Sequence, residues 1–197
     1  MAAPPTAPPT PAMWKPILQR ALQRSRALAQ ARYLQIATVT PEGMPACRTV
    51  VFRGFLHDTT NHLLAITDAR SAKTHDLDAN HHAAVAWYLP KTREQFRIST
   101  RVLMVGAAGP QGAWRPTDAK DDAALAAARI ELWRGLSDKA RAQFLWPPPG
   151  LVRTLPDSAW DDESLPVDPS EPCRCTCLHC WKNKAWGSVV TVVIALQ

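Results

Sequence analysis

The sequence predicts a mainly β protein with flanking helices, an α+β arrangement built on an antiparallel sheet or small barrel. Five short runs are rich in β-branched and aromatic residues and carry the two-residue alternation typical of half-buried strands. Helical patterns occur at the two ends of this region and in one short stretch between strands. Most connections are polar turns rather than crossover helices, which favours antiparallel pairing over a doubly wound fold.

The first half of the chain is predicted to hold one helix and three strands. After a Pro-rich arm over residues 1–12, the apolar residues of 14–31 leave the arginines mainly on the outer face of an amphipathic helix. The runs YLQIATV (33–39) and CRTVVFRGF (47–55) are predicted to form a hairpin, because the intervening TPEG places Pro and Gly at turn positions. A third strand, LLAIT, is expected at 63–67.

In the second half, the spacing of the apolar residues first changes from strand-like alternation to a helical pattern. A short helix is predicted after the third strand, where either Asp68 or Ser71 can cap its N-terminus. The remaining elements are two strands and then two helices, the last of them capped by Ser137. They are expected over residues 83–89, 95–106, 118–136 and 137–146.

Composition indicates a globular protein with uneven charge. The chain has 197 residues, of which 46% are hydrophobic and 20% charged, and its net charge is +6. We expect a single domain over 13–153, an acidic Pro-rich linker over 154–172 and an atypical Cys-rich tail over 173–197. Because the linker has acids and no bases, the domain itself is strongly basic. A phosphate cofactor, a nucleic acid or a membrane surface could each provide the anionic partner.

Cysteine use and the N-terminal sequence bear on the compartment. Four of the five cysteines gather at 173–180, so the body of the chain shows no disulfide framework and a cytoplasmic location is expected. Residues 1–41 contain five bases and no acid, a pattern also typical of organelle transit peptides, so a plastid or mitochondrion is the alternative. The cysteines lack the separated CxxC pairs of zinc sites, and we expect no metal. No apolar run is long enough for a transmembrane helix, and no membrane association is expected.

The octapeptide ITDARSAK (66–73) is a candidate anion site. A strand ends at Thr67 and a helix begins near Ser71, so unpaired amides are expected beside two hydroxyl groups. Arg70 and Lys73 would add positive charge. The alternative is an ordinary capped helix whose cations face solvent.

Arg48 and Arg53 raise a related question, because buried arginine is costly unless it meets an anion. Their strand can pair beside the one that ends at Thr67, which favours a phosphate ester bound between the two elements. Strict alternation places the two arginines on opposite faces, so one site cannot use both without a bulge. An edge strand with solvated arginines is the alternative.

Three motifs resemble those of a known family. RTVVFR (48–53), ITDARSAK (66–73) and REQFRI (93–98) are similar to the flavin-binding motifs of the pyridoxamine 5′-phosphate oxidase-like FMN-binding split barrels, and the resemblance covers roughly residues 13–153. It implies an antiparallel split β-barrel that is a homodimer, with FMN held between the subunits.

The resemblance also implies roles for individual residues. Arg48, Ser71 and Lys73 would bind the FMN phosphate, and Gln95 would hydrogen-bond the flavin ring. Arg53 stands where the oxidases commonly have lysine, which preserves the charge and changes its geometry. Further cofactor contacts would come from Arg53 itself and from Thr49, Val50, Val51, Ile66 and Thr67.

The resemblance leaves the substrate open. The oxidases hold pyridoxal phosphate with tyrosine, arginine and serine of a later helix, whereas residues 118–146 offer arginines and Ser137 but no tyrosine. We therefore expect an FMN-binding oxidoreductase of unknown substrate, without a nameable catalytic side chain. A non-catalytic flavin carrier is the alternative. A basic nucleic-acid-binding protein has less support, and no nucleic-acid partner is expected.

Overall fold

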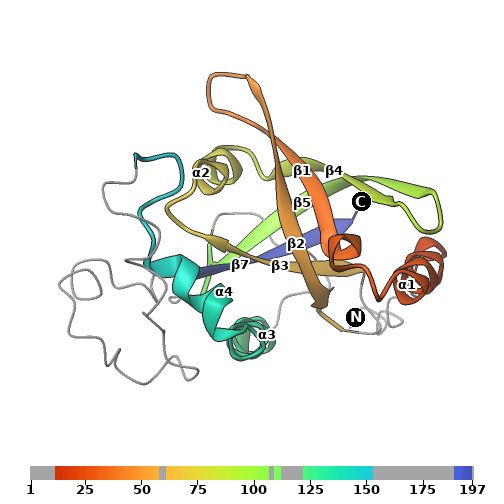
Figure 1. The fold of residues 1–197 in the computed structure, drawn as a ribbon. Helices are drawn as coiled ribbons and strands as arrows, with labels where there is room; N and C mark the ends of the chain where they lie inside the picture. Colours follow the sequence, from red (N-terminus) through yellow and green to blue (C-terminus); the bar gives the residue numbers. More distant parts are fainter. Residues whose placement is uncertain (1–11, 58–60, 107–108, 112–121, 153–188, 197) are drawn as a thin grey trace, which may run out of the picture.

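The computed structural model describes residues 12–57, 61–106, 109–111, 122–152 and 189–196 (Figure 1). Its strands are β1 (Tyr33–Val39), β2 (Pro45–Phe55), β3 (His62–Asp68), β4 (His82–Leu89), β5 (Glu94–Gly106), β6 (Gly109–Gln111) and β7 (Val189–Leu196). Its helices are α1 (Trp14–Arg24), α2 (Ala72–Ala79), α3 (Asp122–Arg134) and α4 (Asp138–Ala142), with short 3₁₀ turns η1 (Ala29–Arg32) and η2 (Gln143–Leu145).

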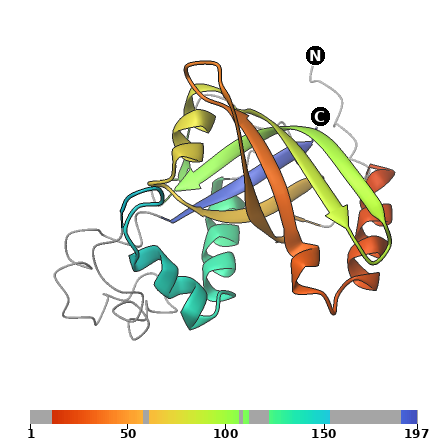
Figure 2. The same cartoon turned by 45° about the horizontal axis from the view of Figure 1, so that its top comes forward.

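The described strands form one antiparallel sheet that curls into a barrel. Neighbouring strands follow the order β4-β1-β2-β3-β7-β5-β6, and β4 also pairs with β5, so six strands close a ring and β6 extends from β5. Strand β5 makes this closure possible because its first half pairs with β4 and its second half with β7. The expected alternation holds along β5, where Gln95, Arg97 and Ser99 are exposed. The fold class is confirmed: a split β-barrel with flanking helices (Figure 2).

The barrel is split beside β2. Residues 45–51 of β2 pair with β1, whereas β3 pairs with β2 only from Phe52 to Phe55. The register shifts between Phe52 and Gly54, and Gly54 has φ +150, in the region that favours glycine. Because β3 continues along β7 instead, no described strand occupies the second edge of β2 over residues 45–51.

The interior of the barrel is a hydrophobic core centred on Trp87. This side chain is fully buried, packs against Phe52 with ring centroids 4.9 Å apart, and donates from Nε1 to Ala31 O at 2.9 Å. α1 contributes Leu18 and Ala21 to the same core.

The N-terminal helix is shorter than expected from the sequence. It ends at Arg24, where the amide of buried Ser25 is shared between Ala21 O and Leu22 O and the next amide, of Arg26, bonds to Gln23 O, so the i→i−4 pattern gives way to a turn. This turn lets Ala31 of η1 pack into the core, which a straight helix to residue 31 could not do. The other predicted strands and α2 begin and end within two residues of the expected positions.

Strand β7 comes from the segment expected to be a tail. It lies between β3 and β5, pairing with residues 62–68 on one side and 100–105 on the other. The sheet therefore extends beyond residue 153, and the run VVTVVIAL forms an inner strand of it, with Ile194 buried in the core. The cysteines at 173–180 lie outside the described residues.

Candidate functional site

Lys73 of α2 lies at the centre of the predicted anion site. Its Nζ donates hydrogen bonds to Thr67 Oγ1 and Ser71 Oγ, each at 2.8 Å. Ser71 stands at the N-cap position of α2, but its hydroxyl donates to Asp68 O at 2.6 Å and caps no amide of the helix. The first-turn amides of α2 therefore lack a side-chain cap, an arrangement suited to binding an anion at a helix N-terminus.

α2 lies beside the β1–β2 hairpin (Figure 1), and Arg48 of β2 is hydrogen-bonded to it. Its Nη2 donates to Asp76 Oδ2 at 3.3 Å, and its Nη1 donates to Thr38 Oγ1 at 2.6 Å and to the carbonyls of Ile36 and Ala46. Thr38 Oγ1 in turn donates to Asp76 Oδ2 at 2.6 Å. Arg48 Nε has no hydrogen-bond partner among the described residues. This donor would be available to a phosphate or carboxylate, which guanidinium groups bind well.

The electrostatics around Lys73 favour an anion. Burial lowers the pKa of Lys73 and the charge of Arg48 lowers it further, while Asp68 and Asp76 act in the opposite direction. The lowered pKa means that the folded protein disfavours this positive charge next to Arg48. A bound phosphate would relieve that repulsion, so the four residues Arg48, Thr67, Ser71 and Lys73 form one candidate phosphate site, called here the phosphate cluster.

The residues expected along the flavin ring lie on or near the open edge of β2. Thr49 is exposed and Val50 and Val51 are half-buried, on the stretch whose second edge no described strand covers. Gln95 is exposed at the start of β5, opposite Tyr88 of β4. It makes no hydrogen bond to the phosphate cluster, and a ligand would have to extend beyond the cluster to reach it.

Arg53 is separate from the phosphate cluster. The register shift at Gly54 lies beside it, as a shared site would require, but the charged or polar groups that bear on Arg53 are Arg32 and Tyr33. Burial is the main cause that lowers the pKa of Arg53, and Arg32 lowers it further. Its Nε is buried and has no hydrogen-bond partner among the described residues.

Arg70 does not supply charge to the phosphate cluster, contrary to the expectation from the sequence. Its guanidinium makes a two-pronged ion pair with Asp68, with the shortest N···O distance 2.6 Å. Nη2 also donates to the carbonyls of Phe144 and Trp146, each at 3.0 Å. Arg70 thus links the turn after β3 to the segment after α4. It pairs with Asp68 rather than with a ligand because the two residues are only two positions apart, which favours a local ion pair.

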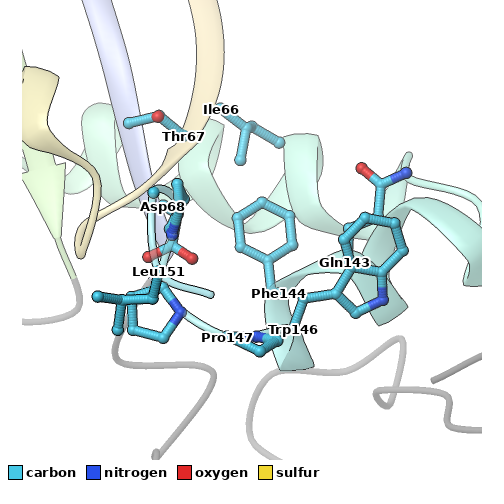
Figure 3. A pocket seen from close by; sticks show the side chains of 11 residues that line it. Ile66, Thr67, Asp68, Gln143, Phe144, Trp146, Pro147 and Leu151 are labelled. Carbon is cyan, nitrogen blue, oxygen red and sulfur yellow. The ribbon is translucent and has the colours of Figure 1, made fainter. Parts of the chain in front are cut away.

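A pocket of about 330 Å³ lies between the end of β3 and the segment after α4 (Figure 3). In the close-up, the Phe144 ring lies below Ile66, and the Asp68 carboxylate points towards Leu151. Ile66 and Thr67, both predicted cofactor contacts, line this pocket. The remaining wall comes from Gln143, Trp146, Pro147, Pro148, Pro149 and Gly150. Since Thr67 also bonds to Lys73, the pocket adjoins the phosphate cluster.

Sequence reasoning missed two members of the hydrogen-bonded network. Asp76 and Thr38 are both buried and hold the Arg48 guanidinium. A signal for Asp76 exists in the sequence, since it follows Lys73 by three residues and so lies on the same side of the helix. No local pattern marks Thr38, whose role depends on the pairing of β1 with β2.

The polar residues of the later helices are mostly used by the fold. Arg129 and Arg141 are buried, and Arg134 pairs with Glu131 at 3.5 Å. The Ser137 hydroxyl accepts a hydrogen bond from an α4 amide and so caps that helix. None of these residues contacts the phosphate cluster in the part of the chain that the structure describes.

Two further absences hold within the described ranges. None of their helices is long and apolar enough to cross a membrane. No group of three or more His, Cys, Asp or Glu side chains there is arranged to hold a metal ion.

Comparisons with known proteins agree with the barrel and its split. The family model for the pyridoxamine 5′-phosphate oxidase FMN-binding domain matches residues 11–106. Pyridoxine/pyridoxamine 5′-phosphate oxidase 2 of Arabidopsis thaliana is 31% identical over 159 residues, which is 81% of this chain and 73% of the relative. The corresponding oxidase of Pseudomonas putida (strain GB-1) is 33% identical over 87 residues, 44% of this chain and 39% of the relative.

Two solved structures extend the comparison. A pyridoxamine 5′-phosphate oxidase-related, FMN-binding protein from Nostoc punctiforme PCC 73102 has 36% identity and a TM-score of 0.72, covering 94% of this chain and 81% of its own. PhzG from Burkholderia lata 383, solved in complex with tetrahydrophenazine-1-carboxylic acid, has 17% identity and a TM-score of 0.56. It covers 97% of this chain and 80% of its own, and at that identity it supports the fold alone.

Proposed function

Because the chain belongs to the pyridoxamine 5′-phosphate oxidase-like family of FMN-binding proteins, we propose that it is a flavin-dependent oxidoreductase whose FMN phosphate binds at the phosphate cluster. The observation that carries this proposal is the pair of cations Arg48 and Lys73. Lys73 donates to Thr67 and Ser71, and burial followed by the charge of Arg48 lowers its pKa, so a bound anion would offset an unfavourable positive charge. Arg48 Nε has no hydrogen-bond partner within the described ranges.

The residues fit FMN in three ways. The phosphate cluster and the uncapped first turn of α2 would hold the phosphate. The open edge of β2 beside Thr49, Val50 and Val51 offers backbone donors and acceptors to a planar heterocycle. Gln95 would add a side-chain amide at the far end of the ring.

When bound, FMN supplies the redox chemistry, and the chain binds, orients and shields it. Positive charge near the phosphate cluster raises local anion affinity and so lowers the FMN concentration needed for occupancy. No side chain of the cluster is required to transfer a proton, and we assign none as catalytic.

The proposal includes a homodimer. Tyr33, Val39 and Tyr88 are 45%, 40% and 52% exposed, and all lie on neighbouring strands β1 and β4. Large exposed apolar side chains gathered on one sheet face are typical of an interface, and a second copy of this chain is the partner that a cyclic dimer uses. Size-exclusion chromatography with light scattering measures this state directly.

An FMN titration tests the proposal. FMN should bind the full-length chain with quenching of its fluorescence, and Lys91→Ala, on an exposed turn, should leave the affinity unchanged. A protein that gains neither flavin absorbance nor thermal stability with added FMN would falsify the assignment.

The non-catalytic carrier remains the second candidate, and one observation favours it. The arginines and serine of α3 and α4 are buried, paired or capping, so none of them is displayed as a substrate-phosphate ligand. Hydrogen peroxide release from the FMN-loaded protein with pyridoxamine 5′-phosphate separates the two. We further propose a cytoplasmic location, with a plastid or mitochondrion as the alternative, from the cysteine distribution and the acid-free N-terminal sequence.

A further inference from the structure

A second cavity lies far from the phosphate cluster. It has a volume of about 250 Å³ and lies between α1, the turn leading to η1, and the end of β2. Both views place α1 on the opposite side of the barrel from α2 (Figures 1 and 2). The lining residues are Gln19, Leu22, Gln23, Arg26, Leu28, Ala31, Arg32, Phe52 and Phe55.

The inner part of this cavity is apolar and aromatic. Phe52 and Phe55 meet edge to face with ring centroids 5.2 Å apart, and both belong to or pack on the core. Leu22 and Leu28 pack against the same core. Lys15 Nζ lies 4.7 Å from the Phe55 ring centroid and donates to His57 O. An edge-to-face pair at the base of a cavity suits a further aromatic ring.

The rim of the cavity is cationic and contains no acid. Arg26 and Arg32 are both exposed, and neither forms an ion pair in the described part of the chain. Arg53 lies close enough to Arg32 to interact electrostatically with it, and no carboxylate of the described residues acts on Arg53. Residues 12–41, which supply α1, η1 and β1, contain no Asp or Glu. Three arginines thus gather at this end of β2 without a counter-charge from the described chain.

We infer that this cavity is a second ligand site, for a small molecule that carries an acidic group, such as a phosphate, on an aromatic ring. The ring lies against Phe52, Phe55, Leu22 and Leu28, and the acidic group meets the guanidinium groups of the rim. The Gln19 and Gln23 amides offer additional hydrogen bonds at the mouth. Cavities that combine an apolar floor with a few convergent polar groups are the usual form of small-molecule sites.

Neither half of this cavity would suffice alone. An uncharged ring would leave the arginines without a counter-charge, and an inorganic anion would leave the apolar floor in water. The site therefore selects for both parts in one molecule. It differs from the phosphate cluster, whose hydroxyl groups and helix amides surround an anion without an aromatic floor.

Phenyl phosphate is a suitable probe, with benzyl alcohol and inorganic phosphate as matched partial ligands. Isothermal titration calorimetry on the FMN-loaded, full-length protein should show phenyl phosphate binding at least tenfold more tightly than either partial ligand. The double variant Arg26→Gln, Arg32→Gln should weaken phenyl phosphate at least tenfold. Arg20→Gln, an exposed cation of α1 outside the cavity, is the control and should leave binding unchanged.

Repeating the phenyl phosphate titration in Arg48→Ala, which damages the phosphate cluster, makes the test of the second site independent of the flavin assignment. Phenyl phosphate binding that persists there and is lost with Arg26→Gln, Arg32→Gln supports the second site whether or not FMN binds. The inference is overturned if phenyl phosphate shows no binding at millimolar concentration. It is also overturned if benzyl alcohol or inorganic phosphate binds equally well, or if the double variant binds normally. Both arginines are exposed, so the double variant should keep its thermal unfolding temperature.

Discussion

Arg48 and Arg53 lie on the same strand, yet their surroundings differ in kind. Arg48 donates to a buried carboxylate, a hydroxyl and two carbonyls, all from α2 and its own hairpin. Arg53 is acted on electrostatically by Arg32 and Tyr33, and its buried Nε has no partner in the part of the chain that the structure describes. The difference follows from what each end of β2 packs near: α2 carries Asp76, whereas α1 carries no acid. A cation held in place by its own protein can present its free edge to a ligand, whereas an unpaired one has no fixed geometry.

The largest expected contrast is in FMN affinity. Arg48→Ala should weaken FMN binding by about 10- to 100-fold, because it removes a charge-assisted contact to the phosphate. Arg53→Ala should change it less than about threefold if the phosphate sits where we propose. Fluorescence titration of both variants measures the two values side by side. Equal losses would mean that one ligand group uses both arginines.

Asp76 tests how Arg48 is held. Asp76→Asn keeps the size of the side chain and removes the charge that accepts from Arg48 and Thr38. We expect the free energy of unfolding to fall by about 1.5–3 kcal/mol, the range for hydrogen bonds to a charged group. Urea denaturation should show a lower midpoint with an unchanged slope. Asp78→Asn, on the exposed side of α2, is the matched control.

Lys73 gives the phosphate cluster a dependence on pH. Its folded-state pKa lies below the usual value of 10.5, and phosphate binding needs the charged amine. FMN affinity should therefore be full at neutral pH and fall by a few fold as pH rises through that lowered pKa. The folding stability of the flavin-free protein should depend on pH in the opposite direction. Between the lowered pKa and 10.5 the unfolded chain binds more protons, so this group adds stability as pH rises.

Lys73→Gln isolates these two effects. The variant should bind FMN more weakly at pH 7 and lose the part of the alkaline decline that belongs to Lys73. Measurements of affinity and of urea stability between pH 7 and 10.5 on both proteins provide the difference. A parallel decline in wild type and variant would assign the pH dependence to another group.

The smallest effect is expected at Arg53 itself. Arg53→Gln removes a charge that faces only Arg32 among the described charged groups, so the free energy of unfolding should change by less than about 0.5 kcal/mol. The same substitution at Arg48 should lower it clearly, since it leaves the buried Asp76 without its cation. Thermal unfolding of the two variants in the same buffer compares them. A large loss at Arg53 would show a partner that the described residues do not contain.

Local patterns predicted much of this arrangement. The alternation along β1, β4 and β5 and the turn chemistry between β1 and β2 are properties of neighbouring residues, and those strands appear where expected. Pairing of β2 beside β3 was also expected, and it is present from Phe52 to Phe55. The fold class, the family and FMN as its cofactor are confirmed, whereas the roles of individual site residues stay predictions.

Other features depend on contacts between distant residues. The end of α1 at Arg24 is set by packing of Ala31, and the hold on Arg48 by Thr38 and Asp76 requires three elements to meet. Arg70 pairs with Asp68 and donates to a carbonyl of the segment after α4. The second contact cannot be predicted from the sequence of residues 66–73 alone. Strand β7 was missed because an abrupt change of composition before it suggested an appendage.

The position of β7 has a consequence for how the protein is made. Its partners β3 and β5 are synthesised well before it, so the growing chain carries two strand edges that cannot yet be covered. Pairing residues so far apart in sequence is slow, because a long loop must close before any contact forms. Uncovered edges are templates for other chains, which makes the incomplete chain the aggregation-prone species. Yield during expression is therefore expected to depend on the last strand as much as on the flavin site.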